Sequence, residues 1–540
     1  MKRIFSYLTA SLIIGLIFIT CKPGEEIDQS LVFKYNQPNI VTSLDPAFAK
    51  SQNNMWVMNH VYNTLVTLDD SLKVIPGLAK SWNISEDGKT YTFHLRTDVF
   101  FHKDSCFKTV TKTRKLTAED VSYSFSRLID NSVNSPGSWI FKEKVTGAEA
   151  FQALDDSTFR IELASPFVPT MGMLTMQYCS IVPKEAVDFY GKDIRLRMVG
   201  TGPYKQKRWI ENQNLFLEIN EDYFDKSYFS SHPPRYIKTS FIPDKQIAVL
   251  ELLKGNLDLV SGLESSFANE LLDTEGKLRA DKADKIVYVR TPFLNTEYIG
   301  INQKLAKEHP ALQHKKFRQA LNWALDRKLM LESLRNGVGQ SATAGFTPKG
   351  LPSFDDTETP GYHYDVEKAR DLIKEVGLDL TKIPPIVINT NAEYMDLATF
   401  VARQWEVIGV KTTIELMDTG ILREGMRNSK LLTFRASWIA DYPDAESYFT
   451  VFYSKNPAPP NYTNFSNAQF DRIYELAIKE TDDEKRYELY HQLERILIDE
   501  APVIFLFYDE SSIFHSVKLK GYTNNGLNML NLWSLYKVEE

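Results

Sequence analysis

The chain has 540 residues, of which 43% are hydrophobic and 25% are charged, and its net charge is −7. This length is too great for one ordinary hydrophobic core, so we expect two or more domains with the composition of a soluble globular protein. The acidic balance disfavours a nucleic-acid partner, because phosphate binding usually requires a basic surface.

The N-terminus is typical of an export signal. Lys2 and Arg3 follow the first methionine, and residues 8–20 form an apolar run that ends at Cys21. The run is shorter than the roughly 18 residues of a membrane span, and it suits the hydrophobic region of a signal peptide. We expect residues 1–21 to be a lipoprotein signal with Cys21 as the lipidated residue. The alternative is an ordinary secretory signal with an incidental cysteine. Residues 22–30 are polar and are expected to form a tether.

Elements of both types follow in the first half of the mature chain. Residues 90–96 alternate apolar and polar side chains, which predicts a half-buried strand, and Asp87-Gly88 before it predicts a hairpin over 82–95. Residues 117–128 are predicted to form a helix that Thr117 caps, with Asp120 three residues later.

Two further cysteines, Cys106 and Cys179, lie in this half. They could form a disulfide in an oxidising compartment or remain as two buried free thiols, and both alternatives stay open. No Cys or His spacing resembles a metal site, and we expect neither a metal nor a cofactor.

A Gly-x-Gly-Pro motif at residues 200–203 predicts a turn in which the glycines supply conformational freedom at φ and the proline fixes a corner. The motif lacks the spacing of a dinucleotide-binding loop and the lysine of a P-loop.

The second half repeats the mixture of helices and strands. An apolar stripe predicts one helix over 317–330, and residues 365–376 predict another, begun by Asp365 and ended by Gly377. A third helix is predicted over 484–500, and the apolar run 503–508 after it indicates a buried central strand. Helices that alternate with buried strands indicate an α/β protein.

Residues 431–444 are the most informative segment for function. Apolar and polar side chains alternate from Leu432 to Trp438, which predicts a strand with one apolar face, and Asp441 to Asp444 form a loop at its carboxyl end. Ligands of open α/β sheets bind outside such strand ends. Asp441 before Tyr-Pro could equally be a simple turn residue.

Several segments together resemble one family, the peptide/nickel-type (oligopeptide- and dipeptide-binding) solute-binding proteins of bacterial ABC transporters. The resemblance covers residues 31–535 and consists of nine pieces in the family's order. They are SLDP (43–46), PGLAKSW with DG and YTFHLR (76–96), LTAEDVSYSF (116–125), GTGPY (200–204), GNLD (255–258), YIGIN (298–302), FRQALNWALD (317–326), YDVEKAR (364–370) and WIADYPD (438–444).

The resemblance implies a large clamshell of the periplasmic-binding-protein type, with two lobes and an extra inserted domain. Lobe I would comprise 31–72, 200–290 and 508–540, the inserted domain 73–199, and the opposing lobe III 291–507. A peptide would be captured between the lobes and delivered to the permease and ATPase subunits of an ABC transporter. The protein would be a monomer held by its lipid anchor in the periplasm or at the cell surface, and it would not be an enzyme.

The resemblance also assigns binding roles by position. Asp441 would bind the α-ammonium of a peptide, and Arg435, six residues earlier, would meet its carboxylate. Arg427 would correspond to a second arginine of the oligopeptide-binding branch, with an offset of one residue. Two segments would pair with the peptide backbone, and Trp438 and Tyr442 would form apolar walls; the segments are Ser437-Trp438-Ile439 and Lys50-Ser51-Gln52. Backbone pairing is independent of the side chains, so broad specificity would follow.

Two further roles have a structural alternative. Arg435 could belong to an ion pair on the strand face, and Trp438 could be a core residue. A different ligand on the same fold, such as a nickel chelate, haem, glutathione or an oligosaccharide, is the second functional hypothesis. A surface receptor or adhesin is the third. The chain has no HExxH and no GxSxG motif, which disfavours an enzyme.

Overall fold

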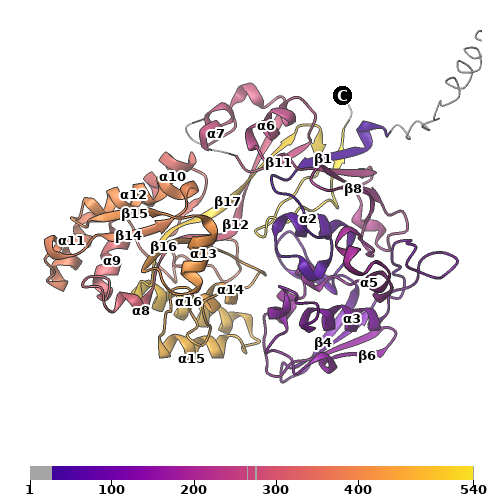
Figure 1. Ribbon diagram of the computed structural model, residues 1–540, viewed down its shortest axis with the longest axis horizontal. Helices are drawn as coiled ribbons and strands as arrows, with labels where there is room; N and C mark the ends of the chain where they lie inside the picture. Colours follow the sequence, from indigo (N-terminus) through magenta and orange to yellow (C-terminus); the bar gives the residue numbers. More distant parts are fainter. Residues whose placement is uncertain (1–26, 264, 274–275, 539–540) are drawn as a thin grey trace, which may run out of the picture.

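The computed structural model describes residues 27–263, 265–273 and 276–538 (Figure 1), so Cys21 and the predicted signal lie outside the described residues. The fold mixes helices with two sheets of four or more strands, as an α/β protein should. Within the described part, no helix is long and apolar enough to cross a membrane.

The larger sheet has eleven strands among the described residues. Their order is β15 (Thr412–Leu416), β14 (Ile386–Thr390), β16 (Thr433–Ile439), β12 (Ile286–Ile301), β17 (Val503–Ser516), β11 (Leu259–Ser261), β1 (Val32–Asn36), β10 (Tyr236–Ser240), β9 (Asn214–Ile219) and β8 (Tyr204–Ile210), and β13 (Gln340–Ser341) pairs with β17. The predicted strand 503–508 is confirmed, and it continues to Ser516.

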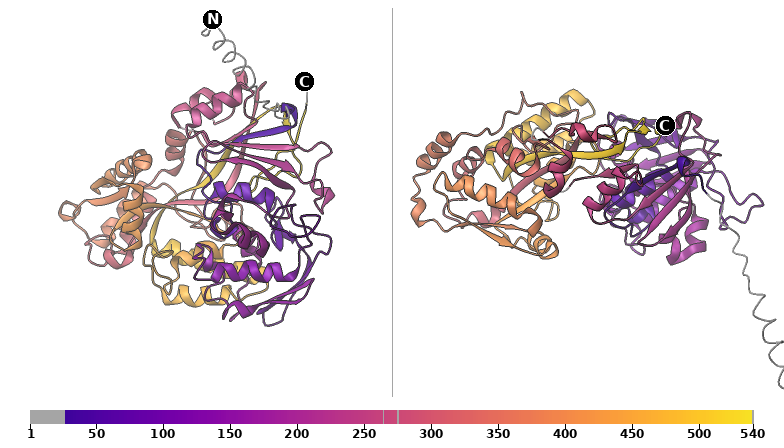
Figure 2. Two further views of the ribbon diagram at one scale, coloured as in Figure 1. Left: turned by 45° about the vertical axis from the view of Figure 1, so that its right-hand side comes forward. Right: turned by 90° about the horizontal axis from the view of Figure 1, so that it is seen from above.

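Two long strands connect the two ends of this sheet. β12 and β17 pair antiparallel along most of their length, with a shift in register between Pro292 and Thr296. After the shift, β12 residues 295–301 pair with β16. Before the shift, where β17 residues 513–515 lie opposite the start of β12, β17 pairs with β11. The sheet therefore belongs to two lobes that share these strands, as the view from above shows (Figure 2).

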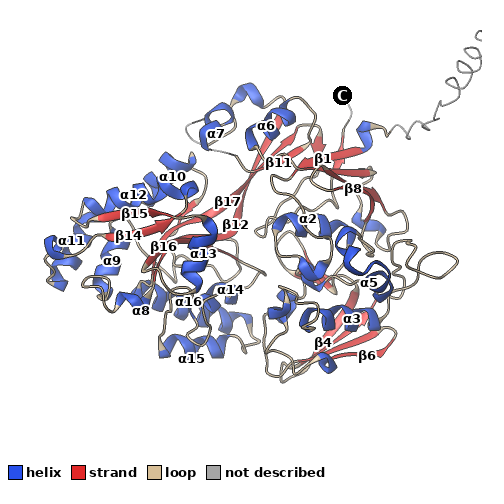
Figure 3. Cartoon of the chain, viewed as in Figure 1, coloured by secondary structure: helices blue, strands red, loops and turns tan. Residues whose placement is uncertain are grey.

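A second, four-stranded sheet lies in the N-terminal half (Figure 3). Its order is β4 (Ala79–Ile84), β5 (Thr90–Leu95), β7 (Thr158–Glu162) and β6 (Phe151–Asp155). β4 and β5 form the predicted hairpin. Two small pairs complete the strands, β2 (Val66–Leu68) with β3 (Val74–Pro76), and β18 (Leu519–Lys520) with β19 (Tyr536–Lys537).

The α-helices surround these sheets. They are α2 (Gln52–Val61), α3 (Ala118–Ile129), α4 (Thr170–Met173), α5 (Lys184–Tyr190), α6 (Lys245–Leu253), α7 (Ser265–Leu271), α8 (Gln303–Ala306), α9 (Lys315–Trp323), α10 (Arg327–Arg335), α11 (Val366–Val376), α12 (Met395–Glu406), α13 (Thr419–Arg427), α14 (Glu446–Phe449), α15 (Ala468–Ala477) and α16 (Asp483–Glu500). The predicted capping box of α3 is present, and α11 begins after Asp365 and ends at Gly377, as its sequence predicts.

The predicted helix over 317–330 is wrong, because the structure has two helices there. α9 ends at Trp323, and α10 begins at Arg327 after Asp326, whose side chain accepts a hydrogen bond from the Leu329 N–H. An aspartate side chain that accepts a backbone N–H favours the start of a helix over its interior, so the backbone breaks at Asp326. The apolar stripe nevertheless continues from one helix to the next.

The two glycines of the Gly-x-Gly-Pro motif act by their size. A Cβ on Gly200 would lie 2.0 Å from the Val61 carbonyl oxygen, and one on Gly202 would lie 2.5 Å from the Val61 carbonyl carbon. Neither residue has a positive φ. The expectation that they supply freedom at φ is therefore wrong, and what the turn requires is close approach to the end of α2.

Cys106 and Cys179 are free and buried, which confirms the free-thiol alternative over the disulfide. Burial raises the pKa of the Cys106 thiol to about 12. A protonated thiol is a poor nucleophile, so this cysteine behaves as a small core residue.

Candidate functional site

Asp441 lies in the loop that follows β16, at the junction of the two lobes. Its side chain remains exposed, yet the surrounding walls remove much of its hydration. This loss of hydration, together with the charge of Glu446, raises the pKa of the Asp441 carboxyl to about 6. Among residues 27–263, 265–273 and 276–538, none donates a hydrogen bond to this carboxylate or forms an ion pair with it.

A buried glutamate stabilises the loop that carries Asp441. Glu446 is 2% exposed and accepts hydrogen bonds from the hydroxyls of Tyr442 and Tyr474. Burial raises the pKa of its carboxyl. The Ser447 hydroxyl oxygen accepts a hydrogen bond from the Asp441 backbone N–H at 3.2 Å. The position of Asp441 is therefore set by residues that follow it in the chain.

Trp438 and Tyr442 are structural members of the site. The Trp438 ring packs partly buried against the core of its lobe, and its Nε1–H donates to the Ser447 carbonyl at 2.6 Å. Tyr442 is 4% exposed. Both residues help to hold the loop in place, and Trp438 retains partly exposed ring surface whereas Tyr442 has little.

Alternate side chains of β16 face opposite ways. Phe434 and Ala436 enter the hydrophobic core, whereas Arg435 and Ser437 face the other side with Ile439, whose side chain is 49% exposed. Strand alternation therefore places the predicted polar contacts on the face away from that core.

Arg435 is in an ion pair on this face. Its guanidinium donates to the Glu297 carboxylate on β12, and it lies 3.1 Å from the centre of the Tyr394 ring. The side chains of the pair are 12% and 4% exposed. Burial raises the pKa of Glu297, and Arg435 opposes that effect. The strand-face ion pair that the sequence left as an alternative is thus present.

The segment Lys50-Ser51-Gln52 stands at the start of α2. Ser51 caps α2, and the Gln52 amide donates to the Asn528 carbonyl at 3.3 Å. Two residues before Asn528, in a turn, the Gly526 carbonyl accepts from the Leu294 N–H, and the Leu294 carbonyl accepts from the Ala440 N–H, each at 2.8 Å. A short series of hydrogen bonds therefore joins Gln52 to the residue before Asp441.

Arg427 does not contact Asp441 or Arg435 in the structure. It lies exposed in the last turn of α13, and its charge acts on Tyr462. None of the contacts recorded for the described residues joins it to Asp441 or Arg435.

The opposite wall comes from the N-terminal half, and sequence reasoning missed it. Trp139 stacks on Tyr442 with ring centres 6.4 Å apart, and a Cβ on Gly172 would lie 3.6 Å from Tyr442 and Pro443. Tyr178 is 7% exposed, and burial followed by the charge of Asp441 raises its pKa.

A backbone hydrogen bond also crosses this junction, from the Val168 N–H to the Ile478 carbonyl at 2.9 Å. Contacts between residues some 300 positions apart leave no periodic signal in the sequence, which explains why the motifs did not point to Trp139, Gly172 or Tyr178.

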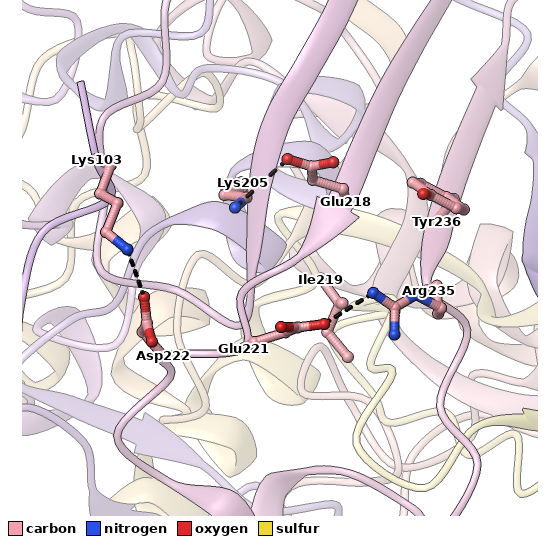
Figure 4. A pocket seen from close by; sticks show the side chains of 8 residues that line it. All are labelled: Lys103, Lys205, Glu218, Ile219, Glu221, Asp222, Arg235 and Tyr236. Carbon is pink, nitrogen blue, oxygen red and sulfur yellow. Dashed lines mark hydrogen bonds and ion pairs between the residues drawn. The ribbon is translucent and has the colours of Figure 1, made fainter. Parts of the chain in front are cut away.

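A separate groove of about 360 Å³ lies on the outer end of the large sheet (Figure 4). Its charges are already matched in pairs, namely Lys103 with Asp222, Lys205 with Glu218, and Arg235 with Glu221. A surface whose charges neutralise one another offers no preference for a charged ligand.

Comparison with known proteins identifies relatives across the chain. The profile of the bacterial extracellular solute-binding proteins, family 5, matches residues 73–460. Heme-binding protein A of Haemophilus influenzae is 30% identical over 86% of this chain and 84% of its own length. The dipeptide-binding protein of Escherichia coli is 30% identical over 86% of each chain. The structure of HbpA2 from Haemophilus parasuis superposes with a TM-score of 0.80 at 23% identity, covering 94% of this chain and all of that one. The expected clamshell fold is thereby confirmed.

Proposed function

Because the chain belongs to family 5 of the bacterial extracellular solute-binding proteins, we propose that it captures peptides between its lobes and delivers them to the permease of an ABC transporter. The single observation that carries this proposal is the unpaired carboxylate of Asp441 at the junction of the lobes. A peptide's ammonium would supply the missing partner and would return the carboxyl to its ionised form.

The rest of the peptide would lie along β16. Ser437 and Ile439 would present backbone groups, and the segment from Lys50 to Gln52 would do so from the other lobe. Arg435 would have to exchange Glu297 for the peptide carboxylate, whereas Arg427 would approach only from the end of α13. The proposed contacts thus differ in cost, with Asp441 the one that needs no rearrangement.

Further parts of the proposal concern organisation and anchoring. Lobe I would comprise 31–72, 200–290 and 508–540, with an inserted domain over 73–199 and lobe III over 291–507. Cys21 would carry the lipid, and the protein would act as a monomer without a chemical step. The family is extracellular, which places the chain outside the cytoplasm.

The test is thermal unfolding of the protein after removal of bound ligand. Di- to pentapeptides are compared with N-acetylated copies of the same sequences. A free peptide at 100 times its Kd should add about 2.7 kcal/mol of stability, and the acetylated copy should add far less because it lacks the ammonium.

Asp441→Ala should abolish the shift given by free peptides. Asp371→Asn, an exposed carboxylate on α11 in the same lobe, is the matched control and should leave it unchanged. Equal shifts with free and acetylated peptides would refute the Asp441 contact. No shift with any peptide, together with an absorption band on adding haem, would redirect the proposal to another ligand of the same fold.

A further inference from the structure

A second cavity, of about 630 Å³, lies at the end of α2 that is remote from Gln52. Its walls are formed by residues 59–64, the β2–β3 hairpin, residues 223–230 and residues 531–534. None of the described residues that line it belongs to 291–507, the segment that carries Asp441. The volume is within the range of small-molecule sites, about 300–1,000 Å³. The cavity is therefore separate from the candidate peptide site and large enough for a ligand.

Aromatic rings from distant parts of the chain form much of this wall. The rings of Tyr223 and Tyr228 are 5.5 Å apart, and those of Tyr228 and Trp533 are 6.2 Å apart. Tyr62 and Phe229 line the same space. The ring faces carry negative electrostatic potential, so such a cluster attracts cations more than anions.

The charged groups of the lining have the same preference. The described lining residues include three carboxylates, those of Asp69, Asp70 and Asp225, and one cation, Arg96. Arg96 already pairs with Asp98 at 3.3 Å and lies over the Phe224 ring at 4.7 Å. Its charge is therefore offset locally, and the cavity as a whole is negative.

Asp70 is the carboxylate with the weakest compensation. Within the described part of the chain, the Thr523 hydroxyl alone donates to it, over a long 3.4 Å, whereas Asp69 accepts hydrogen bonds from two backbone N–H groups at 2.9 Å. Asp225 is engaged by Ser227. Asp70 is exposed, yet partial loss of hydration raises the pKa of its carboxyl, so a cation in the cavity would relieve an existing cost.

We propose that this cavity binds a small organic cation, a primary or quaternary amine carried on an aromatic or apolar body. The amine would lie between Asp70 and the aromatic faces, and the body would fill the space lined by Tyr228 and Trp533. This assignment is independent of the proposed peptide capture, because it uses none of the residues around Asp441.

Three compounds with one ring system test the charge preference. Tryptamine is cationic, tryptophol is neutral and indole-3-acetate is anionic, and all three are titrated into the ligand-free protein by calorimetry. Tryptamine should bind at least about tenfold more tightly than tryptophol, and indole-3-acetate should bind weakest. Equal affinity for tryptamine and tryptophol, or no tryptamine binding at millimolar concentration, would overturn the proposal.

Variants then locate the bound amine. Asp70→Asn should weaken tryptamine binding about fivefold, and Thr67→Arg, which adds a positive charge at an exposed lining position, should weaken it more than tenfold. Asp441→Ala should leave tryptamine binding unchanged, and neither cavity variant should alter peptide binding. If Asp441→Ala removed tryptamine binding while Thr67→Arg did not, the amine would lie in the peptide site and the cavity assignment would fail. Unchanged unfolding midpoints confirm that the variants fold.

Discussion

Glu297 and Arg435 form a nearly buried ion pair between β12 and β16, the two strands on which the candidate site is built. The pair is a cross-strand diagonal, because Glu297 lies opposite Ser437 and Arg435 lies opposite Ile299. Tyr394 covers the guanidinium from the side. Arg435, which was predicted to contact the ligand, thus also links two neighbouring strands of the sheet.

Breaking this pair should destabilise the protein. Glu297→Gln leaves a nearly buried guanidinium without its anion, and we expect a loss of about 3 kcal/mol in the free energy of unfolding, measured by urea denaturation. The double variant Glu297→Gln with Arg435→Gln should recover most of that loss, since no uncompensated charge remains. Additive losses in the double variant would contradict a direct interaction.

Peptide affinity should depend on pH through Asp441. The ammonium requires the ionised carboxylate, and the pKa of that carboxyl in the free protein is raised to about 6. Affinity should therefore be constant from pH 6.5 to 7.5 and should fall as pH decreases below about 6, approaching tenfold per unit. Calorimetric titration over this range is the measurement. A flat profile down to pH 4.5 would show that Asp441 does not bind the ammonium.

The same group should lower the stability of the unliganded protein. A carboxyl whose pKa is higher when folded than its ordinary 3.8 takes up its proton more readily in the folded state. Its ionisation therefore costs stability above about pH 6, and the cost disappears as pH falls toward 4. Asp441→Asn should raise the free energy of unfolding at pH 7.5, by no more than about 1 kcal/mol because the side chain retains solvent contact. Asp371→Asn should show no such gain, and a gain for Asp441→Asn that persisted at pH 4 would contradict this explanation.

Closure of the lobes should depend on the size of residue 172. A Cβ on Gly172 makes ordinary contact with Tyr442 and Pro443 at 3.6 Å, so Gly172→Ala should bind peptide normally. Gly172→Leu would push the loop and the opposite wall apart, and we expect at least tenfold weaker binding with an unchanged unfolding midpoint. Normal affinity in the leucine variant would show that peptide is held without this contact.

The sequence predicted local structure best where a residue and its near neighbours decide the outcome. Asp365 and Gly377 bound a helix, and Asp87-Gly88 mark a hairpin, because caps and turns are short-range features. The break at Asp326 was missed because the apolar stripe is continuous across it. Asp441 was found through its motif, whereas Tyr178 and Trp139 were not, since their approach to the loop depends on how two lobes pack. Glu297 was missed for a different reason, because its partner Arg435 lies on a neighbouring strand that is more than a hundred residues away in the sequence.

The position of β17 in the chain has a consequence for how the protein folds. This strand pairs with β11, β12 and β13, yet it is made of residues 503–516 of 540. Neither lobe can complete its share of the large sheet until almost the whole polypeptide is available, and contacts of such long sequence separation form slowly. The N-terminal four-fifths emerging from a ribosome therefore has no finished central sheet to collapse upon.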